Sequence, residues 1–328
     1  MPKRIRVGFI GCGGISNGHA QRLKAVPEAR ISALMDVDAN SLKTFQERNP
    51  ETGDCPVFLD YQEMLDSVEL DAVEIHSPHT AHFQQMMDAL DRGLHVLVEK
   101  PMVCSVEHAK QILDKAEQVG TVVLVSYQRH YEPEFRYIRE SIASGILGEV
   151  QFVSAFQCQD WYRSQQGKWR QDPALSGGGQ LNDSGSHLID IILWTTGLGA
   201  SEVTGYIDNL GTAVDINSAL SIKFGNRAQG SVSIVGNAPT FWEDLTFLGS
   251  EGAIFQRNGK LSHLPQNGKM FEPTQLPGGP ANADANFINA ILGREEVESP
   301  PECALRVIEL TEAAWKSAET GHPVKVGP

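Results

Sequence analysis

An apolar strand runs directly into a glycine turn and the start of a helix in Ile5-Arg6-Val7-Gly8-Phe9-Ile10-Gly11-Cys12-Gly13-Gly14-Ile15-Ser16. Glycines at such a turn let backbone N–H groups at the helix N-terminus come close to an anion. Because a strand, a glycine turn and a helix open a β-α-β unit, this stretch predicts an α/β fold with a doubly wound parallel sheet.

The alternation of strands and helices continues to about residue 126. We expect further strands at 31–35, 72–76, 94–98 and 121–126, and helices from about residue 17, at 82–92 and at 105–119. Regular β-α-β order is typical of a parallel sheet. Residues 1–126 are therefore predicted to form the first domain.

The chain changes character after residue 126. After a helix at 134–144 comes a strand at 149–157 with no parallel repeat after it, and then short alternating strands. These are expected at 202–207, 218–224, 229–235, 245–248 and 253–256, and two helices follow at 283–292 and 302–319. The pattern predicts an α+β domain, residues 127–328, on an open-faced and mostly antiparallel sheet. Residues 265–280 are predicted to be a surface loop.

Composition excludes several classes of function. The net charge is 27 − 41 = −14, which argues against nucleic acid and anionic membranes as partners. No apolar run is long enough to span a membrane. The five cysteines are scattered and show neither zinc spacing nor a disulfide framework, so we expect a cytoplasmic protein.

The glycine turn is a candidate dinucleotide site. Gly11 and Gly13 occupy the first two glycine positions of the G-x-G-x-x-G pattern, and Ser16 occupies the third, which weakens the match. Asp36 ends the second strand, 36 − 11 = 25 residues further on. A carboxylate there accepts hydrogen bonds from ribose hydroxyls and repels a 2′-phosphate, so the sequence favours NAD over NADP.

The segment Glu99-Lys100-Pro101 follows the predicted strand 94–98. Parallel sheets bind ligands beyond the carboxyl ends of their strands, and proline restricts the residue before it to extended conformations. Lys100 is therefore placed for chemistry. A solvated strand end with a prolyl stop is the alternative.

A second cluster follows the glycine run 177–179, which lets the backbone pass close to a ligand. Asp183 and His187 are four residues apart and are expected to share one helix face. A histidine oriented by a carboxylate is a good acceptor for the proton of an alcohol. The alternatives are a pair that stabilises a helix start, and a metal pair, which has no third ligand nearby.

Aromatic and cationic residues gather just before that glycine run. Aromatic faces pack on the apolar face of a sugar, and arginines bind carboxylate or phosphate groups. We therefore expect a substrate-binding segment, with a subunit contact or a lid as alternatives. The candidates are Trp161, Tyr162, Arg163, Trp169 and Arg170, with Lys168 as a further cation.

These motifs occur in the order seen in the glucose–fructose oxidoreductase / inositol dehydrogenase (Gfo/Idh/MocA) family, and the chain resembles it over nearly its whole length. The likeness rests on Gly11-x-Gly13, Asp36, Ser77-Pro78…His82, Glu99-Lys100-Pro101, Gln128-Arg129-His130-Tyr131, Gly177-Gly178-Gly179…Asp183…His187 and the C-terminal 314–321.

The resemblance implies a Rossmann domain, bound NAD(P) and hydride transfer at a carbinol carbon of a sugar or cyclitol. It implies that Lys100 contacts substrate and nicotinamide ribose, that Asp183 positions substrate and that His187 is the acid/base. It also implies a homodimer or homotetramer assembled through the C-terminal sheet. The cofactor-binding residues are predicted to be Gly11, Gly13, Gly14, Ile15, Ser16, Asp36, Ser77, Pro78, His79, His82, Glu99, Lys100 and Arg129.

His79 departs from the family pattern, because an asparagine is common at its position. His76, His79 and His82 recur every three residues, but the resemblance explains this segment as a cofactor loop, so no metal is expected. Two other functions stay open beside the dehydrogenase. One is glycoside cleavage with tightly bound NAD, by transient oxidation and elimination, and the other is a non-catalytic NAD-binding regulator.

Overall fold

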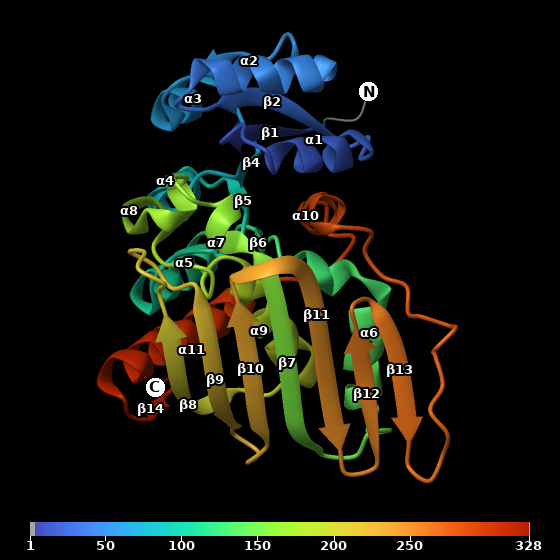
Figure 1. Ribbon diagram of the computed structural model, residues 1–328. Helices are drawn as coiled ribbons and strands as arrows, with labels where there is room; N and C mark the ends of the chain where they lie inside the picture. Colours follow the sequence, from blue (N-terminus) through green and yellow to red (C-terminus); the bar gives the residue numbers. More distant parts are fainter. Residues whose placement is uncertain (1–3, 328) are drawn as a thin grey trace. The chain divides into compact units, whose positions relative to one another are not determined.

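The structure is a computed structural model and describes residues 4–327 (Figure 1). The chain divides into two compact units. Unit 1 comprises the residues up to Val103, Glu107–Gln128 and Pro280–Glu302, and unit 2 comprises Cys104–Val106, Arg129–Gly279 and the residues from Cys303 onward. The sequence-based boundary at residue 126 stays a prediction.

Unit 1 is built on a six-stranded sheet in the order β3-β2-β1-β4-β5-β6 with every neighbouring pair parallel, which confirms the doubly wound sheet. The strands are β1 (Ile5–Ile10), β2 (Ala29–Met35), β3 (Val57–Phe58), β4 (Ala72–Ile75), β5 (His95–Val98) and β6 (Val123–Val125). Strands β4, β5 and β6 are almost completely buried, and apart from Glu74 in β4 and His95 in β5 they are apolar, as a sheet covered on both faces requires.

The helices of this unit include two that the sequence did not predict, α2 and α3. Both begin where an aspartate caps the helix: Asp38 accepts from the backbone N–H of Asn40, and Asp60 accepts from that of Glu63. The helices are α1 (Ser16–Lys24), α2 (Ala39–Arg48), α3 (Tyr61–Ser67), α4 (His82–Asp91), α5 (Val106–Val119) and α10 (Ala283–Ile291), with 3-10 turns η1 (Pro50–Thr52) and η2 (His79–Ala81).

Unit 2 is built on an eight-stranded sheet in the order β13-β12-β11-β7-β10-β9-β8-β14. Its strands are β7 (Val150–Asp160), β8 (Ala200–Asp208), β9 (Asn217–Phe224), β10 (Gln229–Val235), β11 (Asn237–Gly249), β12 (Gly252–Arg257), β13 (Lys260–Pro265) and β14 (Val324–Lys325). The sheet is mostly antiparallel, as predicted, but β7 pairs with β10 in parallel. Strands β13 and β14 were missed.

One face of this sheet is covered by helices. Figure 1 shows α6 (Pro133–Ala143), α9 (Ser184–Thr196) and α11 (Pro301–Thr320) on the same side. On the other face, outward side chains of β9 and β10 alternate with buried ones, which is the pattern of a sheet covered on one side only. The predicted open-faced sheet is confirmed.

The remaining elements of unit 2 are short. They are η3 (Gln128–Tyr131, shared with unit 1), α7 (Trp161–Ser164), η4 (Trp169–Gln171) and α8 (Pro173–Ser176). The predicted surface loop at 265–280 is found as irregular chain, with one isolated bridge between His263 and Phe271.

Candidate active site

The glycine turn between β1 and α1 has the geometry of a phosphate cradle. Gly11 has a φ of +93°, and a Cβ there would lie 2.9 Å from the backbone of His76 and Ser77, so only glycine fits. At Gly13 and Gly14 a Cβ would meet no atom within 4 Å. The backbone at these two positions is therefore open to close approach by a ligand at a helix N-terminus.

Ser16 fits the turn although it replaces the third glycine. Its side chain is buried and its hydroxyl donates to the carbonyl oxygen of Gly13 over 2.7 Å. The hydroxyl satisfies a turn carbonyl, so this departure from the glycine pattern leaves the cradle intact.

Asp36 lies at the end of β2, next to the same turn. One carboxylate oxygen accepts the N–H of Cys12 over 2.8 Å, and the other accepts the N–H of Asp38 over 3.0 Å. The carboxylate is only partly buried. The glycine turn and this oriented acid together fit the phosphate and ribose parts of a dinucleotide.

The loops after β4 and β5 are held together by His82. Its ring nitrogens lie 2.9 Å from the carbonyl oxygens of Pro101 and Ser77, and burial lowers the pKa of the imidazole. His79, in the same loop, is also buried. His82 therefore positions these loops, and a direct contact of His79 or His82 with a cofactor stays a prediction.

Glu99 and Lys100 follow β5. Glu99 is buried and lies 2.9 Å from Nε2 of His19. Burial opposes ionisation of Glu99, but the hydrogen bond from His19 outweighs it and lowers the pKa of the carboxyl. Lys100 is partly exposed, and the Lys100–Pro101 peptide bond is cis.

In unit 2, Asp183 immediately precedes α9, which begins at Ser184, so the expected shared helix face with His187 is wrong. The Asp183 carboxylate accepts from the indole N–H of Trp161 over 2.8 Å and from Nε of Arg170 over 3.0 Å. His187 lies in the first turn of α9 and is partly exposed. Two side chains from separate short elements thus fix this carboxylate at the start of the helix that carries His187.

The aromatic and cationic segment is largely engaged within the protein. Trp161 is 4 % exposed and packs with Val214 and Ile216. Arg163 pairs with Asp160 over 2.9 Å, and the guanidinium of Arg170 lies over the ring of Trp169 as well as on Asp183. Direct substrate contacts by Trp161, Tyr162, Arg163, Trp169 and Arg170 stay predictions.

Close packing within unit 2 requires glycine at two positions of the glycine run. The expected approach of this run to a ligand stays a prediction. A Cβ at Gly178 would come 2.6 Å from the ring of Trp315, and one at Gly179 would come 2.0 Å from the carbonyl oxygen of Asp215. The Asp215 carboxylate accepts from the N–H groups of Gly179 and Leu181 and from the Trp315 indole, and burial raises its pKa.

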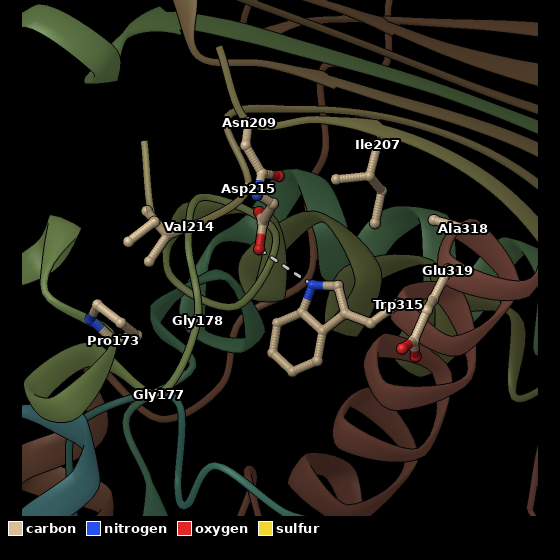
Figure 2. Close-up of a pocket in the computed structure, with 11 residues that line it drawn as sticks. Pro173, Gly177, Gly178, Ile207, Asn209, Val214, Asp215, Trp315, Ala318 and Glu319 are labelled. Carbon is tan, nitrogen blue, oxygen red and sulfur yellow. Dashed lines mark hydrogen bonds between the residues drawn. The ribbon is translucent and has the colours of Figure 1, made fainter. Parts of the chain in front are cut away.

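A pocket of about 440 Å³ lies in this region. Figure 2 shows residues that line it and the hydrogen bond between Asp215 and Trp315. Neither Asp183 nor His187 lines it. Asp215 was not predicted from the sequence, because it lies 36 residues after Gly179 and no neighbouring residue indicates that the two pack together.

Arg129 is also committed to a protein partner. Its guanidinium lies 2.5 Å from the carboxylate of Glu243 on β11, which also accepts from Gln157 over 3.0 Å. Cofactor binding by Arg129 stays a prediction. Glu243 was not predicted, because its pairing depends on the sheet register.

The fold and the glycine turn define a two-domain protein with a Rossmann unit. The family model described as "Oxidoreductase family, NAD-binding Rossmann fold" matches residues 5–127, and the "GFO/IDH/MocA C-terminal domain" matches residues 135–255. The chain belongs to the Gfo/Idh/MocA family of NAD-binding oxidoreductases, which confirms the resemblance.

Similar proteins act on sugars and cyclitols. D-glucoside 3-dehydrogenase of Escherichia coli (strain K12) is 28 % identical, over 98 % of this chain and 97 % of that protein. scyllo-Inositol 2-dehydrogenase (NAD(+)) of Bacillus subtilis (strain 168) is 26 % identical, over 83 % and 80 %. Four other curated relatives align over only 42 to 58 % of their own length.

Among solved structures, levoglucosan dehydrogenase in complex with NADH and levoglucosan has a TM-score of 0.88. It is 20 % identical to this chain and aligns over 99 % of it and 100 % of the other chain, which shows a shared fold. Within residues 4–327, no helix is long and apolar enough to cross a membrane.

Proposed function

We propose that this protein is an NAD-dependent dehydrogenase that oxidises a carbinol carbon of a sugar, a sugar acid or a cyclitol. The observation that carries the proposal is the Asp183 carboxylate, held by Trp161 and Arg170 at the start of the helix that carries His187. Membership of an oxidoreductase family supports hydride chemistry, and the names of the relatives support a carbohydrate or cyclitol substrate.

In this proposal the glycine turn binds the pyrophosphate through its N–H groups, and Asp36 accepts from ribose hydroxyls. NAD, when bound, supplies the hydride acceptor. His187 takes the proton of the substrate hydroxyl, and Lys100 stabilises the negative charge that develops on that oxygen. Asp183 holds the substrate in register.

The proposal is tested by assaying the purified protein with NAD⁺ against inositols, aldoses, sugar acids and glycosides. We expect steady NADH formation with one class of compound, with one ketone formed for each NADH. Cleavage of a glycoside without net formation of NADH would instead support an enzyme that retains its NAD and cleaves by transient oxidation and elimination. Binding of NAD without turnover of any compound would support a non-catalytic regulator.

Cofactor preference is expected to depend on Asp36. We predict that Asp36→Asn, which keeps an acceptor for the Cys12 N–H, and Asp36→Ser both narrow the preference for NAD over NADP. Loss of a charged hydrogen bond of about 1.5–3 kcal/mol corresponds to about 10- to 100-fold in the ratio of kcat/KM values. No arginine or lysine lies among residues 37–40 to bind a 2′-phosphate. A wild-type enzyme that uses NADP equally well would refute this assignment.

Arg170 and Arg163 form a matched pair of variants. Arg170→Ala removes a hydrogen bond to Asp183 that Trp161 only partly replaces, so we expect kcat/KM to fall by about tenfold. Arg163→Ala breaks only a solvent-exposed pair with Asp160. A change in kcat/KM of less than about threefold in this variant would contradict the predicted substrate contact of Arg163.

Because Asp183 already neutralises Arg170, the loss on Arg170→Ala should be equal for an acidic sugar and for its neutral parent. A larger loss for the acidic sugar would instead indicate that Arg170 binds a substrate anion directly.

The open face of the sheet supports a homo-oligomer. Large apolar side chains are exposed on unit 2, among them Tyr206 at 80 %, Phe241 at 51 % and Trp242 at 43 %. Exposed apolar side chains of this size favour a protein partner, and we infer a homodimer or homotetramer formed through this sheet. Light scattering that finds a monomer would contradict this inference.

A further inference from the structure

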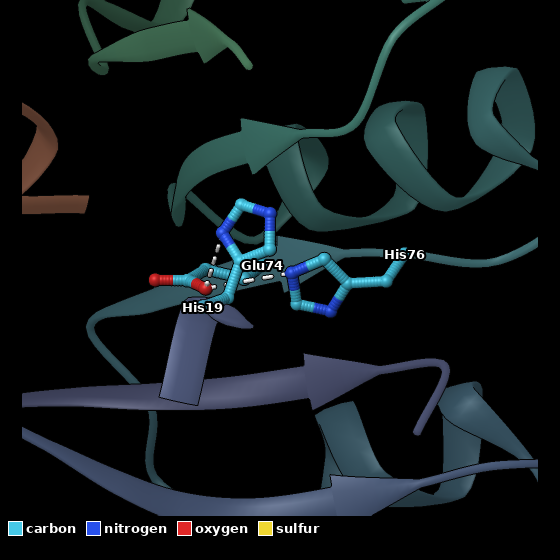
Figure 3. Close-up of side chains that lie close together, drawn as sticks. All are labelled: His19, Glu74 and His76. Atoms are coloured by element: carbon cyan, nitrogen blue, oxygen red, sulfur yellow. Dashed lines mark ion pairs between the residues drawn. The ribbon is translucent and has the colours of Figure 1, made fainter. Parts of the chain in front are cut away.

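Three ionisable side chains meet in the interior of unit 1, one from α1, one from β4 and one from the residue directly after β4. One ligand atom from each of His19, Glu74 and His76 lies within 4.8 Å of the others, and all three residues are buried. The Glu74 carboxylate lies 3.6 Å from Nδ1 of His19 and 3.5 Å from Nε2 of His76. Figure 3 shows both ion pairs converging on this carboxylate.

Two members of the cluster have their polar atoms unsatisfied. Within residues 4–327, neither carboxylate oxygen of Glu74 and neither ring nitrogen of His76 makes a hydrogen bond. Both side chains are 0 % exposed. An unsatisfied buried polar group costs about 1–3 kcal/mol, and more when it is charged, so such groups usually have a partner such as an ion or an ordered water.

The surroundings of the cluster carry an excess of negative charge. Nδ1 of His19 lies 2.9 Å from Asp284 on α10, and its Nε2 lies 2.9 Å from Glu99. Asp284 also pairs with Arg22 over 2.5 Å. The three carboxylates of Glu74, Glu99 and Asp284 and the guanidinium of Arg22 together carry a formal charge of −3 + 1 = −2. The ammonium group of Lys100, beside Glu99, is partly exposed and offsets this charge only in part.

We propose that His19, Glu74 and His76 bind a first-row divalent transition-metal ion of the Zn²⁺ class, and that the ion replaces the proton that Nδ1 of His19 shares with Asp284. Two imidazoles and a carboxylate are ligands that suit Zn²⁺ and its neighbours. Ligand atoms around a tetrahedral ion with bonds of about 2.0–2.1 Å are about 3.3 Å apart, close to the two separations at Glu74.

The second shell of such a site is already present. When Nδ1 of His19 is a ligand, Nε2–H donates to Glu99, which is the carboxylate–histidine–metal arrangement that orients metal-binding histidines. The ion would connect α1, β4 and the residue directly after β4 inside the Rossmann unit. The inference does not depend on the proposed function.

Protons compete with a metal ion for the ligand atoms of His19 and Glu74. Burial opposes protonation of His19, but Asp284 and Glu99 outweigh it and raise its pKa to about 10, while burial and Asp284 raise the pKa of Glu74 to about 8. Protons on His19 and Glu74 would therefore offset negative charge in the metal-free cluster. His76 is held neutral, because burial, with His19 and His82 also contributing, lowers its pKa despite Glu99 and the Gly11 backbone.

A bound metal ion requires an ionised Glu74 carboxylate, whereas the metal-free cluster holds Glu74 protonated. A glutamine closely mimics a protonated glutamate but is a poor metal ligand, so Glu74→Gln separates them. His76→Phe keeps a ring against Phe9, whose centroid lies 4.9 Å away, and removes the second imidazole ligand. His322→Ala is the control, because that histidine is exposed and lies outside unit 1.

The experiment is to express the full chain and these variants with added Zn²⁺, wash with EDTA, and measure bound metal by mass spectrometry. We expect about one ion per chain in the wild type and in His322→Ala, and at least a tenfold lower content in Glu74→Gln and His76→Phe. We also expect both cluster variants to unfold at a lower temperature than the Zn²⁺-loaded wild type.

A wild type with less than about 0.1 ion per chain, or a Glu74→Gln variant with unchanged metal content, would overturn the proposal. If the variants fail to fold, the proposal is tested instead by expressing the wild type with added Co²⁺ and recording its visible absorption spectrum. Visible absorption bands of a protein-bound Co²⁺ ion at one per chain would support the site, and their absence would contradict it.

Discussion

Replacing His187 with alanine should lower turnover by about 10²- to 10⁴-fold, which is the usual contribution of a positioned general base. The variant loses the group that takes the hydroxyl proton, so the oxygen must lose its proton to water while hydride leaves. NAD binding should be unchanged, because the glycine turn and Asp36 belong to unit 1 and His187 to unit 2.

The measurement is steady-state turnover together with NAD affinity by calorimetry, on the best substrate of the panel. His322→Ala removes an exposed histidine at the end of the chain and should behave as the wild type. Turnover within threefold of the wild type in His187→Ala would show that another group accepts the proton.

Replacing Lys100 with methionine should lower turnover by about 10²- to 10³-fold, as removal of one donor to a developing oxyanion does in other enzymes. Methionine keeps most of the length of the side chain and removes only the charge and its donors. Glu99 would lose a cationic neighbour, but its hydrogen bond from His19 should hold the loop in place.

The matched control is Lys110→Met, since Lys110 is exposed on α5. A selective effect on KM in Lys100→Met, with kcat unchanged, would mean that Lys100 binds substrate equally well in the ground and transition states. The role in stabilising the alkoxide would then be wrong.

Features coded by neighbouring residues could be predicted from the sequence. The strand, the glycine turn and the helix at 5–24 are contiguous, and Asp36 follows the next strand. Because neighbouring strands of a β-α-β unit lie parallel, the sequence alone predicts that Asp36 lies beside the glycine turn. Helices α2 and α3 were missed although Asp38 and Asp60 are typical N-cap residues. Attention to capping would have found both.

Features that depend on distant pairing could not be predicted. The hydrophobic alternation of β7 shows that a strand is present but not that it pairs with β10 in parallel. The glycines at 178 and 179 are required by Trp315 and Asp215, which lie 36 residues or more away in the chain. The sequence likewise does not indicate that His19 lies beside Glu74 and His76, since only the fold brings α1 onto β4.

The candidate site shows the same division. Asp183 and His187 were found because they are close in sequence, but their expected shared helix face was wrong because α9 begins after Asp183. The residues that hold Asp183 were singled out as substrate contacts, while the structure makes Trp161 and Arg170 its hydrogen-bond donors. The sequence pattern thus identified the residues of the candidate site. Only the tertiary structure shows that Trp161 and Arg170 position Asp183.

Hydride transfer itself is tested most directly with deuterium at the reacting carbon of the best substrate from the panel. We predict that deuterium accumulates in the nicotinamide ring, one for each ketone formed, and that Asp36→Asn retains this transfer with NAD⁺. Substrate conversion in which deuterium never enters the nicotinamide, or in which no NADH accumulates while a glycosidic bond is cleaved, would contradict the account.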